Sequence, residues 1–283
     1  MAYSYQSLTH TLMDGGIDPA DAKEEALLLL TAFAGVDRVT LLCDRHKIYD
    51  TPALNAAVEK RLTRYPIQYI LGKWDFYGCT FRVDEHCLIP RPDTEILVEQ
   101  AVAALPEGGV FADLCTGSGC VAVAILKARP DLRAVALELY PETLRLAEEN
   151  AELNGVSDRM IPLCADLLNG GIDALASHAP LCGIVSNPPY IPQKVVDGLA
   201  PELFFEPRAA LDGGEDGLVF YRKILSDYTP LLAADAPLLL EIGYDQGDAL
   251  TALGKRYLPQ VPAEIVCDLG GHPRVAVFRH RAE

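Results

Sequence analysis

The sequence predicts an α/β protein with a doubly wound, mostly parallel seven-stranded sheet, preceded by a small helical domain and a β-hairpin linker. Three observations support this prediction. The chain up to about Tyr65 carries helical patterns, an aromatic segment around Gly78 is typical of a hairpin, and short apolar runs alternate with helices after Gly108-Gly109. At 283 residues the chain is long enough for one large domain and one small one.

The N-terminal segment contains clear signals for the beginnings and ends of helices. Asp18-Pro19 and Thr51-Pro52 each place an N-cap side chain before a proline at the first helical position. Gly15-Gly16 and Gly35 follow apolar helical faces and are typical helix ends. No residue here suggests catalysis, so we expect a helical domain that stabilises the chain or docks a partner.

A β-hairpin is predicted over Lys73–Val83, because aromatic and apolar residues lie on both sides of Gly78. In Ile89–Glu95 the prolines disfavour a helix before Pro92, and we expect a helix to begin near Asp93. The chain is therefore divided into a helical domain (1–72), a hairpin linker (73–92) and an α/β domain (93–283).

Seven short apolar runs are the candidate strands of the sheet. They are Val110–Leu114, Ala134–Leu137, Met160–Cys164, Cys182–Ser186, Pro237–Ile242, Ala263–Cys267 and Val275–Phe278. Helical patterns separate the earlier runs, which indicates parallel strands joined by helical crossovers. The last two runs lack an obvious helix between them, so we expect an antiparallel hairpin at the sheet edge.

The composition disfavours several classes of function. A formal net charge of −16 argues against bulk binding to the phosphates of nucleic acids. None of the eight cysteines forms a C-x-x-C motif and no Cys/His spacing resembles a zinc site, so no metal is predicted. No signal peptide or apolar run of membrane-spanning length is evident, and we expect a cytoplasmic protein without a membrane partner.

The stretch Leu181–Tyr190 is the most informative part of the chain. Its apolar run predicts a buried strand that ends at two prolines, which places Asn187 at the carboxyl end of a parallel sheet, where ligands bind. The Asn187 amide can accept and donate hydrogen bonds. Pro188 and Pro189 give a stiff backbone with carbonyl acceptors, and Tyr190 offers a flat ring. These groups suit a planar –NH2 group, although an ordinary strand-ending turn has the same sequence pattern.

The first predicted strand ends in a glycine-containing loop, Asp113-Leu-Cys-Thr-Gly-Ser-Gly119, which is followed by a helix. Gly117 and Gly119 permit a tight turn and a close approach of ligand to backbone. The loop has neither the G-x-G-x-x-G pattern of dinucleotide sites nor the G-K-[ST] of P-loops. The Asp113 carboxylate would repel a phosphate, but it could hold a cationic amine.

Two further strand ends carry carboxylates. Glu138 lies about twenty residues beyond the glycines, where an acidic side chain can accept the hydroxyls of a ribose. Asp166 follows the third strand and could accept the amino group of an adenine. Contacts to an amine, a ribose and an adenine, with no phosphate required, describe S-adenosylmethionine better than NAD. Each acid taken alone is also typical of a solvated strand end.

These motifs resemble those of a known family. Asp113–Gly119 resembles motif I of class I S-adenosylmethionine methyltransferases, and Asn187–Tyr190 resembles the acceptor motif of enzymes that methylate planar nitrogens. From about Pro66 to its C-terminus, the chain is similar to the HemK/PrmC family of peptide chain release factor glutamine methyltransferases. The similarity also includes Pro66–Tyr69, Phe76–Gly78, Ile89–Glu95, Phe205–Pro207 and Asp212–Gly217.

The resemblance implies a class I, Rossmann-like fold and methylation of the side-chain amide of glutamine in the Gly-Gly-Gln loop of class 1 release factors. S-adenosylmethionine would be the donor, S-adenosylhomocysteine the product, and the N-terminal helices would dock the substrate. The acceptor glutamine is assigned to Asn187, Pro188, Pro189 and Tyr190. The cofactor is assigned to Asp113, Cys115, Thr116, Gly117, Ser118, Gly119, Glu138, Asp166, Leu167 and Asn187.

Three positions depart from the family pattern. Glu138 stands where Asp is common, and its extra methylene should still reach a ribose. Cys115 replaces a frequent glycine, which the loop tolerates if φ at this residue is negative. Leu167 stands where an aromatic residue can flank the adenine.

Other functions share parts of this pattern. Relatives that methylate a glutamine of a large-subunit ribosomal protein also contain Asn-Pro-Pro-Tyr, and Arg91–Glu95 favours the release factor over that substrate. An adenine amino-group methyltransferase acting on nucleic acid would use Asn187–Tyr190 on a flipped base, but the charge of −16 and the lack of a basic recognition segment disfavour it. A non-catalytic docking factor and a Rossmann oxidoreductase are the remaining alternatives.

Overall fold

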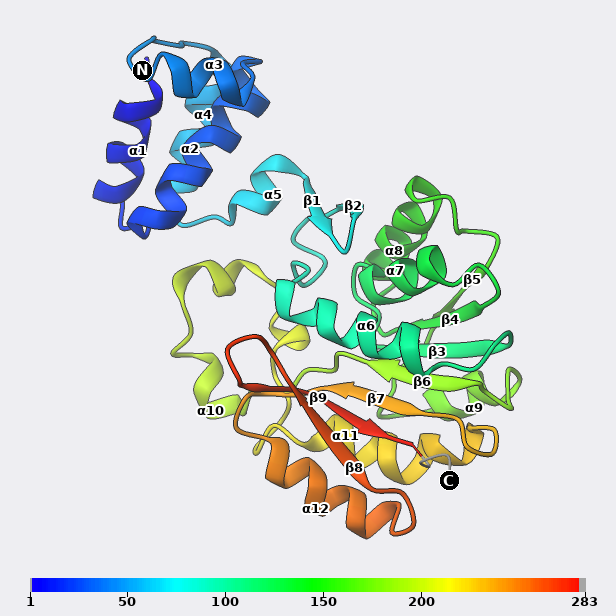
Figure 1. Cartoon of the computed structure of the whole chain (residues 1–283). Helices are drawn as coiled ribbons and strands as arrows, with labels where there is room; N and C mark the ends of the chain where they lie inside the picture. Colours follow the sequence, from blue (N-terminus) through cyan, green and yellow to red (C-terminus); the bar gives the residue numbers. More distant parts are fainter. Residues whose placement is uncertain (1, 280–283) are drawn as a thin grey trace. The chain divides into compact units, whose positions relative to one another are not determined.

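The computed structural model describes residues 2–279, so the predicted domain ends at residues 1 and 283 lie outside it (Figure 1). The chain forms two compact units. The first contains the residues up to Lys73 together with Ala200–Phe205, and the second contains Trp74–Leu199 and the chain from Glu206 onward. Each unit is described by itself below.

The first unit is helical, as the sequence predicts. Its helices are α1 (Tyr5–Asp14), α2 (Pro19–Ala34), α3 (Arg38–Cys43), α4 (Pro52–Leu62) and α5 (Ile67–Leu71). The Asp18 carboxylate accepts from the Ala20 N–H, and the Thr51 hydroxyl accepts from the Leu54 N–H, so both predicted N-caps are present. Buried leucines of α1 and α2 pack with α4 to form a separate hydrophobic core.

A buried ion pair connects α4 and α2 of this unit. Nε of Arg61, whose side chain is 4% exposed, lies 2.7 Å from a carboxylate oxygen of Glu25. Glu202, from the distant segment Ala200–Phe205, accepts from both Arg61 and Arg64 at 3.2 and 2.7 Å. The Phe205 ring packs edge-on against Tyr65. These contacts attach the segment to the helices, and no pattern in the sequence predicted them.

The predicted β-hairpin is confirmed. Strands β1 (Lys73–Phe76) and β2 (Cys79–Arg82) pair with each other, and the turn between them contains Tyr77 and Gly78 with φ of 48° and 71°. Positive φ at both central residues is typical of tight hairpin turns. The Tyr77 N–H donates to Glu95 at 2.8 Å, which attaches the turn to the start of the next helix.

The second unit is built on a seven-stranded sheet with the order β5-β4-β3-β6-β7-β9-β8. The strands are β3 (Val110–Leu114), β4 (Arg133–Glu138), β5 (Met160–Cys164), β6 (Gly183–Ser186), β7 (Leu238–Glu241), β8 (Ala263–Cys267) and β9 (Pro273–Phe278). Strands β3 to β7 are parallel, and β9 is antiparallel to both β7 and β8. The predicted parallel sheet and its antiparallel edge hairpin are therefore confirmed.

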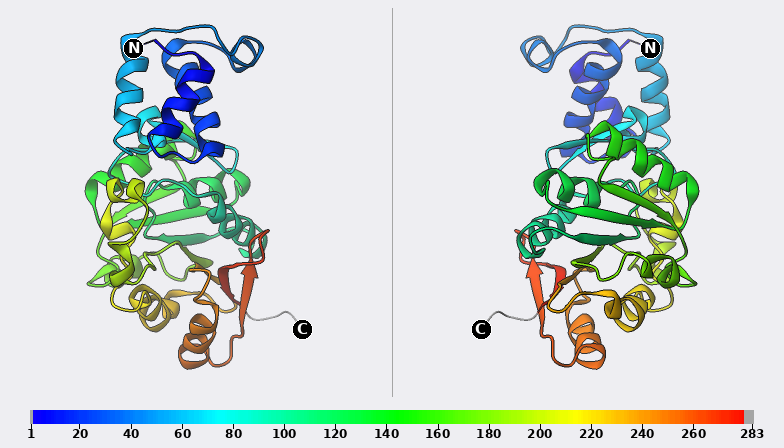
Figure 2. Two further views of the ribbon diagram at one scale, coloured as in Figure 1. Left: turned by 90° about the vertical axis from the view of Figure 1, so that its left-hand side faces the viewer. Right: turned by 90° about the vertical axis from the view of Figure 1, so that its right-hand side faces the viewer.

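Helices cover both faces of this sheet (Figures 1 and 2). One face carries α6 (Glu95–Ala104), α7 (Cys120–Ala128) and α8 (Pro141–Leu153). The other carries α9 (Gly171–Ala176), α11 (Val219–Lys223), a π-helical turn (Ile224–Tyr228) and α12 (Gly247–Tyr257). The short α10 (Gln193–Val196) lies in the connection between β6 and α11. Within residues 2–279, no helix is both long and apolar enough to cross a membrane.

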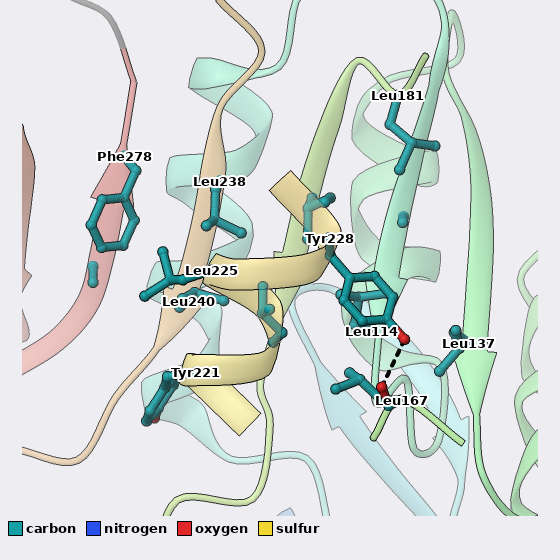
Figure 3. Packing of buried hydrophobic residues seen from close by; sticks show 14 of the residues in the cluster. Leu114, Leu137, Leu167, Leu181, Tyr221, Leu225, Tyr228, Leu238, Leu240 and Phe278 are labelled. Carbon is teal, nitrogen blue, oxygen red and sulfur yellow. Dashed lines mark hydrogen bonds between the residues drawn. The ribbon is translucent and has the colours of Figure 1, made fainter. Parts of the chain in front are cut away.

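Apolar side chains on the α9–α12 face form the core shown in Figure 3. Tyr228 is fully buried there, and its hydroxyl donates to the Leu167 carbonyl at 2.8 Å. Each large apolar side chain that is buried stabilises the folded state by about 1.5–3 kcal/mol, and the hydrogen bond offsets the cost of burying the Tyr228 hydroxyl. The core thereby fixes the loop after β5.

The strand order places a topological switch point between β3 and β6. Leu114, the last residue of β3, lies between Leu137 of β4 and Ser186 of β6. The Ser186 hydroxyl donates to the Leu114 carbonyl at 2.5 Å, which joins the two strand ends. Connections leave these strands in opposite directions, so a crevice forms between them. The loops Cys115–Gly119 and Asn187–Tyr190 both begin at this crevice.

Candidate active site

A pocket in the second unit opens at the carboxyl ends of β3, β4, β5 and β6. The predicted residues that line it are Asp113, Cys115, Thr116, Gly117, Ser118, Glu138, Asp166, Leu167, Asn187 and Pro189. Gly119, Pro188 and Tyr190 adjoin these residues without lining the pocket. Three further groups of lining residues were not assigned to a ligand from the sequence. They are His86–Arg91 with Thr94; Leu139, Tyr140 and Thr143; and Pro207, Ala209, Ala210 and Phe220. The first and third overlap Ile89–Glu95 and Phe205–Pro207, so part of the signal was present in those motifs.

Asp113 is a buried carboxyl group at the base of the pocket. It is 1% exposed, and its Oδ2 accepts from the Thr116 hydroxyl at 2.6 Å and from the Ala122 N–H at 3.2 Å. Burial raises the pKa of Asp113 to about 7, against the opposing effect of these hydrogen bonds. The carboxyl group therefore changes charge near neutral pH, and a cation bound beside it would favour the ionised form.

The loop after β3 has left-handed backbone at three positions. Gly117 and Gly119 have φ of 55° and 79°. Cys115 has a φ of 60°. The negative φ that we expected from the sequence at this residue is therefore wrong. A left-handed conformation costs a residue with a Cβ roughly 1–2 kcal/mol. The loop nevertheless holds Cys115 in this conformation beside the pocket.

Replacing Gly119 with alanine is expected to destabilise the second unit. A Cβ at this position would lie 3.0 Å from Cβ of Ala147 and would occupy a left-handed backbone. We expect the free energy of unfolding to fall by about 1–3 kcal/mol, as measured by denaturant titration. Gly198→Ala is the matched control, because its added Cβ makes only an ordinary contact at 3.6 Å. Equal effects of the two substitutions would contradict this account of the loop.

Glu138 connects the loops after β3 and β4. Its two carboxylate oxygens accept from the backbone N–H groups of Gly117, Leu139 and Tyr140, at 3.0, 2.9 and 3.2 Å. Burial raises the pKa of Glu138, and the three backbone donors partly offset this rise. A carboxylate offers about four acceptor positions, so a position remains for a ligand hydroxyl.

Asp166 and Leu167 form the pocket wall after β5. The Asp166 carboxylate accepts from the Leu168 N–H and from the Asn169 side chain, and the hydrogen bond from Asn169 lowers its pKa. Leu167 is 3% exposed and belongs to the core under the sheet. The wall therefore combines an ionised carboxylate with an apolar surface.

In the loop after β6, Asn187–Tyr190, called the acceptor loop below, the Asn187 side chain and the Pro188 carbonyl offer hydrogen-bond acceptors. Nδ2 of Asn187 donates to the Thr94 hydroxyl oxygen at 3.2 Å, so Oδ1 points elsewhere. Among residues 2–279, no group donates to Oδ1 of Asn187 or to the Pro188 carbonyl. These two oxygens are available to accept the two protons of a planar amide or amine.

Tyr190 is fixed at both its ends. Its hydroxyl lies 3.5 Å from Oε1 of Glu241, and its carbonyl accepts from Nε2 of Gln246 at 3.0 Å. Glycines pack directly against this residue: a Cβ on Gly213 would lie 2.7 Å from Cα of Tyr190, and one on Gly217 would lie 2.3 Å from its carbonyl oxygen. Close packing against Tyr190 explains two glycines of the Asp212–Gly217 motif, Gly213 and Gly217.

A second set of contacts fixes the loop on the far side of the pocket. Glu206 is 5% exposed and accepts from the Ile89 N–H at 3.0 Å. It also pairs with the Arg91 guanidinium, which is partly exposed. The motifs Ile89–Glu95 and Phe205–Pro207 are therefore in direct contact, and Pro90, Arg91 and Pro207 line the pocket beside them.

Family models match both units of the chain, and solved structures match much of its length. A family model described as PrmC N-terminal domain matches residues 5–72, and one described as methyltransferase small domain matches residues 92–234. The catalytic domain of hMettl16 in complex with MAT2A 3'UTR hairpin 6 matches with a TM-score of 0.57 at 14% identity, covering 84% of this chain and 86% of that one. A SAM-dependent methyltransferase from Agrobacterium tumefaciens matches with a TM-score of 0.51 at 14% identity, covering 74% and 70%. At these identities the solved structures show the fold alone.

Curated relatives match nearly the whole chain. A release factor glutamine methyltransferase of Caulobacter vibrioides is 36% identical over 273 residues, which cover 94% of this chain and 91% of the relative. One of Geobacter sulfurreducens is 38% identical over 249 residues, covering 87% and 84%. One of Rhodospirillum rubrum is 35% identical over 300 residues, covering 95% and 90%. With both family models and these relatives in agreement, the chain belongs to the release factor glutamine methyltransferase family.

Proposed function

We propose that this protein methylates the side-chain amide nitrogen of the glutamine in the Gly-Gly-Gln loop of peptide chain release factors, with S-adenosylmethionine as the methyl donor. The observation that carries the proposal is the meeting of two loops at the switch point. The strand pairing of Leu114 with Ser186 brings the Asp113–Gly119 loop beside Asn187–Tyr190. A methyl donor and an amide acceptor bound by these loops would lie next to each other.

The pocket residues fit the chemical groups of the donor. Asp113 is a buried carboxyl group that suits an ammonium group, and Glu138 retains an acceptor position for a ribose hydroxyl. The apolar side of Leu167 and the carboxylate of Asp166 suit the face and the amino group of an adenine. When bound, S-adenosylmethionine supplies an electrophilic methyl group that passes to the amide nitrogen, and S-adenosylhomocysteine is left.

The acceptor loop addresses the main difficulty of the reaction. The lone pair of an amide nitrogen is delocalised into its carbonyl, so the nitrogen is a poor nucleophile. Oδ1 of Asn187 and the Pro188 carbonyl each accept a hydrogen bond from one N–H group of the glutamine amide. These hydrogen bonds orient the nitrogen and stabilise the positive charge that develops on it. Pro189 and the Tyr190 ring hold the plane of the amide. The N–C bond forms as the S–C bond breaks, and the nitrogen then loses a proton to water.

Two alternatives share this chemistry, a glutamine of a ribosomal protein and an adenine amino group of nucleic acid. The names of the relatives support the release factor, and the net charge of −16 disfavours nucleic acid. We propose that the helical unit docks the release factor, because a separate family model described as PrmC N-terminal domain matches that part of the chain.

A competition assay tests the choice of substrate. The protein is incubated with methyl-labelled S-adenosylmethionine and equal amounts of a release factor, ribosomal large-subunit proteins, and DNA or RNA. We expect label in the release factor and none in a release factor whose Gly-Gly-Gln glutamine is replaced by alanine. Label that appears in the ribosomal proteins or the nucleic acid instead would overturn the proposed substrate.

A further inference from the structure

We propose that Glu241 is a positioning residue for methyl transfer, which orients the acceptor residues Asn187 and Tyr190 through hydrogen bonds from the end of β7. This inference rests on the proposed function of the acceptor loop. Glu241 lies outside the pocket lining and touches neither proposed ligand, so its effect would pass through its neighbours.

The sheet register places Glu241 level with the acceptor loop. Ser186 of β6 pairs with Leu240 of the adjacent parallel strand β7. Asn187 and Glu241 directly follow these paired residues, so they lie at the same level of the sheet. Glu241 is 2% exposed. Its backbone carbonyl accepts from the Tyr221 hydroxyl at 2.8 Å, which holds the strand end in place from α11.

Two short paths lead from the Glu241 carboxylate to the acceptor residues. The Tyr190 hydroxyl lies 3.5 Å from Oε1, which is the direct path. The Thr94 hydroxyl is near enough to this carboxyl group to lower its pKa, and Thr94 Oγ1 accepts from Nδ2 of Asn187. When Thr94 donates its proton to Glu241, its oxygen faces Asn187 as an acceptor. This direction of donation holds Nδ2 of Asn187 toward Thr94 and turns Oδ1 toward the acceptor site.

Burying the Glu241 carboxyl group costs free energy, because one of its oxygens is left without a hydrogen bond from the described part of the chain. Oε2 has no hydrogen-bond partner among residues 2–279, and burial raises the pKa of the carboxyl group to about 7. The titratable or charged groups that face it are Asp93 of the turn before α6, Tyr190, Tyr221 of α11, Arg274 of β9 and Cys120 of α7. An apolar residue of similar size would avoid the cost of burying a carboxyl group, so packing alone does not explain a glutamate here.

The ionised carboxylate is the form that can accept from the Tyr190 and Thr94 hydroxyls. The protonated form would instead offer its own proton and weaken the donation from Thr94 or Tyr190. Turnover at saturating donor should therefore rise as pH increases through about 7. Asp113 has a raised pKa in the same range, but a bound ammonium group would keep it ionised, so at saturating donor this rise reports Glu241.

The test compares Glu241→Leu, Glu241→Gln and the control Glu264→Gln, an exposed glutamate on β8 of the same sheet. Methylation of a release factor gives kcat and KM at pH 6 to 8.5, and calorimetry gives the affinity for S-adenosylhomocysteine. We expect Glu241→Leu to lower kcat by about 10- to 100-fold through misplaced acceptor groups, with KM and ligand affinity within about twofold. Glu241→Gln keeps an acceptor oxygen, so most of the activity should return, without the rise near pH 7.

A second comparison tests the path through Thr94. Thr94→Val should reduce kcat, and combining it with Glu241→Leu should give less than the product of the two separate losses. Unchanged kcat in Glu241→Leu, a loss confined to KM or ligand affinity, or a rise near pH 7 that persists in Glu241→Gln would overturn the inference. Failure of the unaltered protein to methylate the release factor would instead overturn the proposed function.

Discussion

Replacing Asn187 with alanine is expected to lower turnover about 100- to 1,000-fold. Oδ1 of Asn187 receives no hydrogen bond from residues 2–279, and removing a single group that stabilises transition-state charge typically costs about 3–4 kcal/mol. The affinity for the methyl donor should weaken much less, because the Asp113–Gly119 loop and Glu138 remain. Single-turnover methylation of a release factor measures the first effect, and calorimetry with S-adenosylhomocysteine measures the second.

Two variants sharpen this prediction. Asn187→Asp keeps an acceptor oxygen but loses the N–H donated to Thr94, so we expect partial activity, above that of Asn187→Ala. Asn154→Ala, at the end of α8 and outside the pocket lining, is the control and should leave turnover unchanged. Near-normal turnover in Asn187→Ala would remove this residue from the mechanism.

Replacing Asp113 with asparagine is expected to weaken donor binding by at least about 100-fold. The variant keeps the shape of the side chain but removes the charge proposed to face the ammonium group, and breaking a buried charge pair typically costs about 3–5 kcal/mol. Calorimetry with S-adenosylmethionine measures the loss. Asp173→Asn, on the exposed side of α9, is the matched control. Unchanged affinity in Asp113→Asn would show that the ammonium group binds elsewhere.

The titration of Asp113 is expected to make donor affinity and stability depend on pH. Because its pKa in the folded protein is about 7, only about a tenth of the molecules carry the ionised form at pH 6, and donor affinity should be about tenfold weaker there than at pH 8. The folded state holds a proton that the unfolded state has already released between about pH 4 and 7, so the stability contributed by this group falls as pH rises through that range. Asp113→Asn should lose the pH dependence of affinity and become more stable than the unaltered protein at pH 8.

Most of the fold was predictable because its signals are local. The N-caps at Asp18 and Thr51, the apolar strands and the two glycines of the loop after β3 each depend on a few neighbouring residues. The attachment of Ala200–Phe205 to the helical unit was not predictable, because it depends on Glu202 meeting Arg61 and Arg64 from a distant part of the chain.

The candidate site divides in the same way. Motif residues such as Asp113 and Asn187 could be named from sequence, because strand ends of a parallel sheet gather at one edge. Glu241 could not, since it is the last residue of an otherwise apolar strand, and only the pairing of β6 with β7 brings it level with Asn187. The positive φ of Cys115 was equally hidden, because residue type favours the opposite sign.

We propose that the two loops at the switch point transfer a methyl group to one glutamine nitrogen. Tandem mass spectrometry of a release factor incubated with the protein and S-adenosylmethionine tests this proposal. We expect one added methyl group on the side-chain nitrogen of the Gly-Gly-Gln glutamine, and its loss when the protein carries Asn187→Ala. A methyl group on another residue, or an unmodified release factor beside a protein that binds the donor, would contradict it.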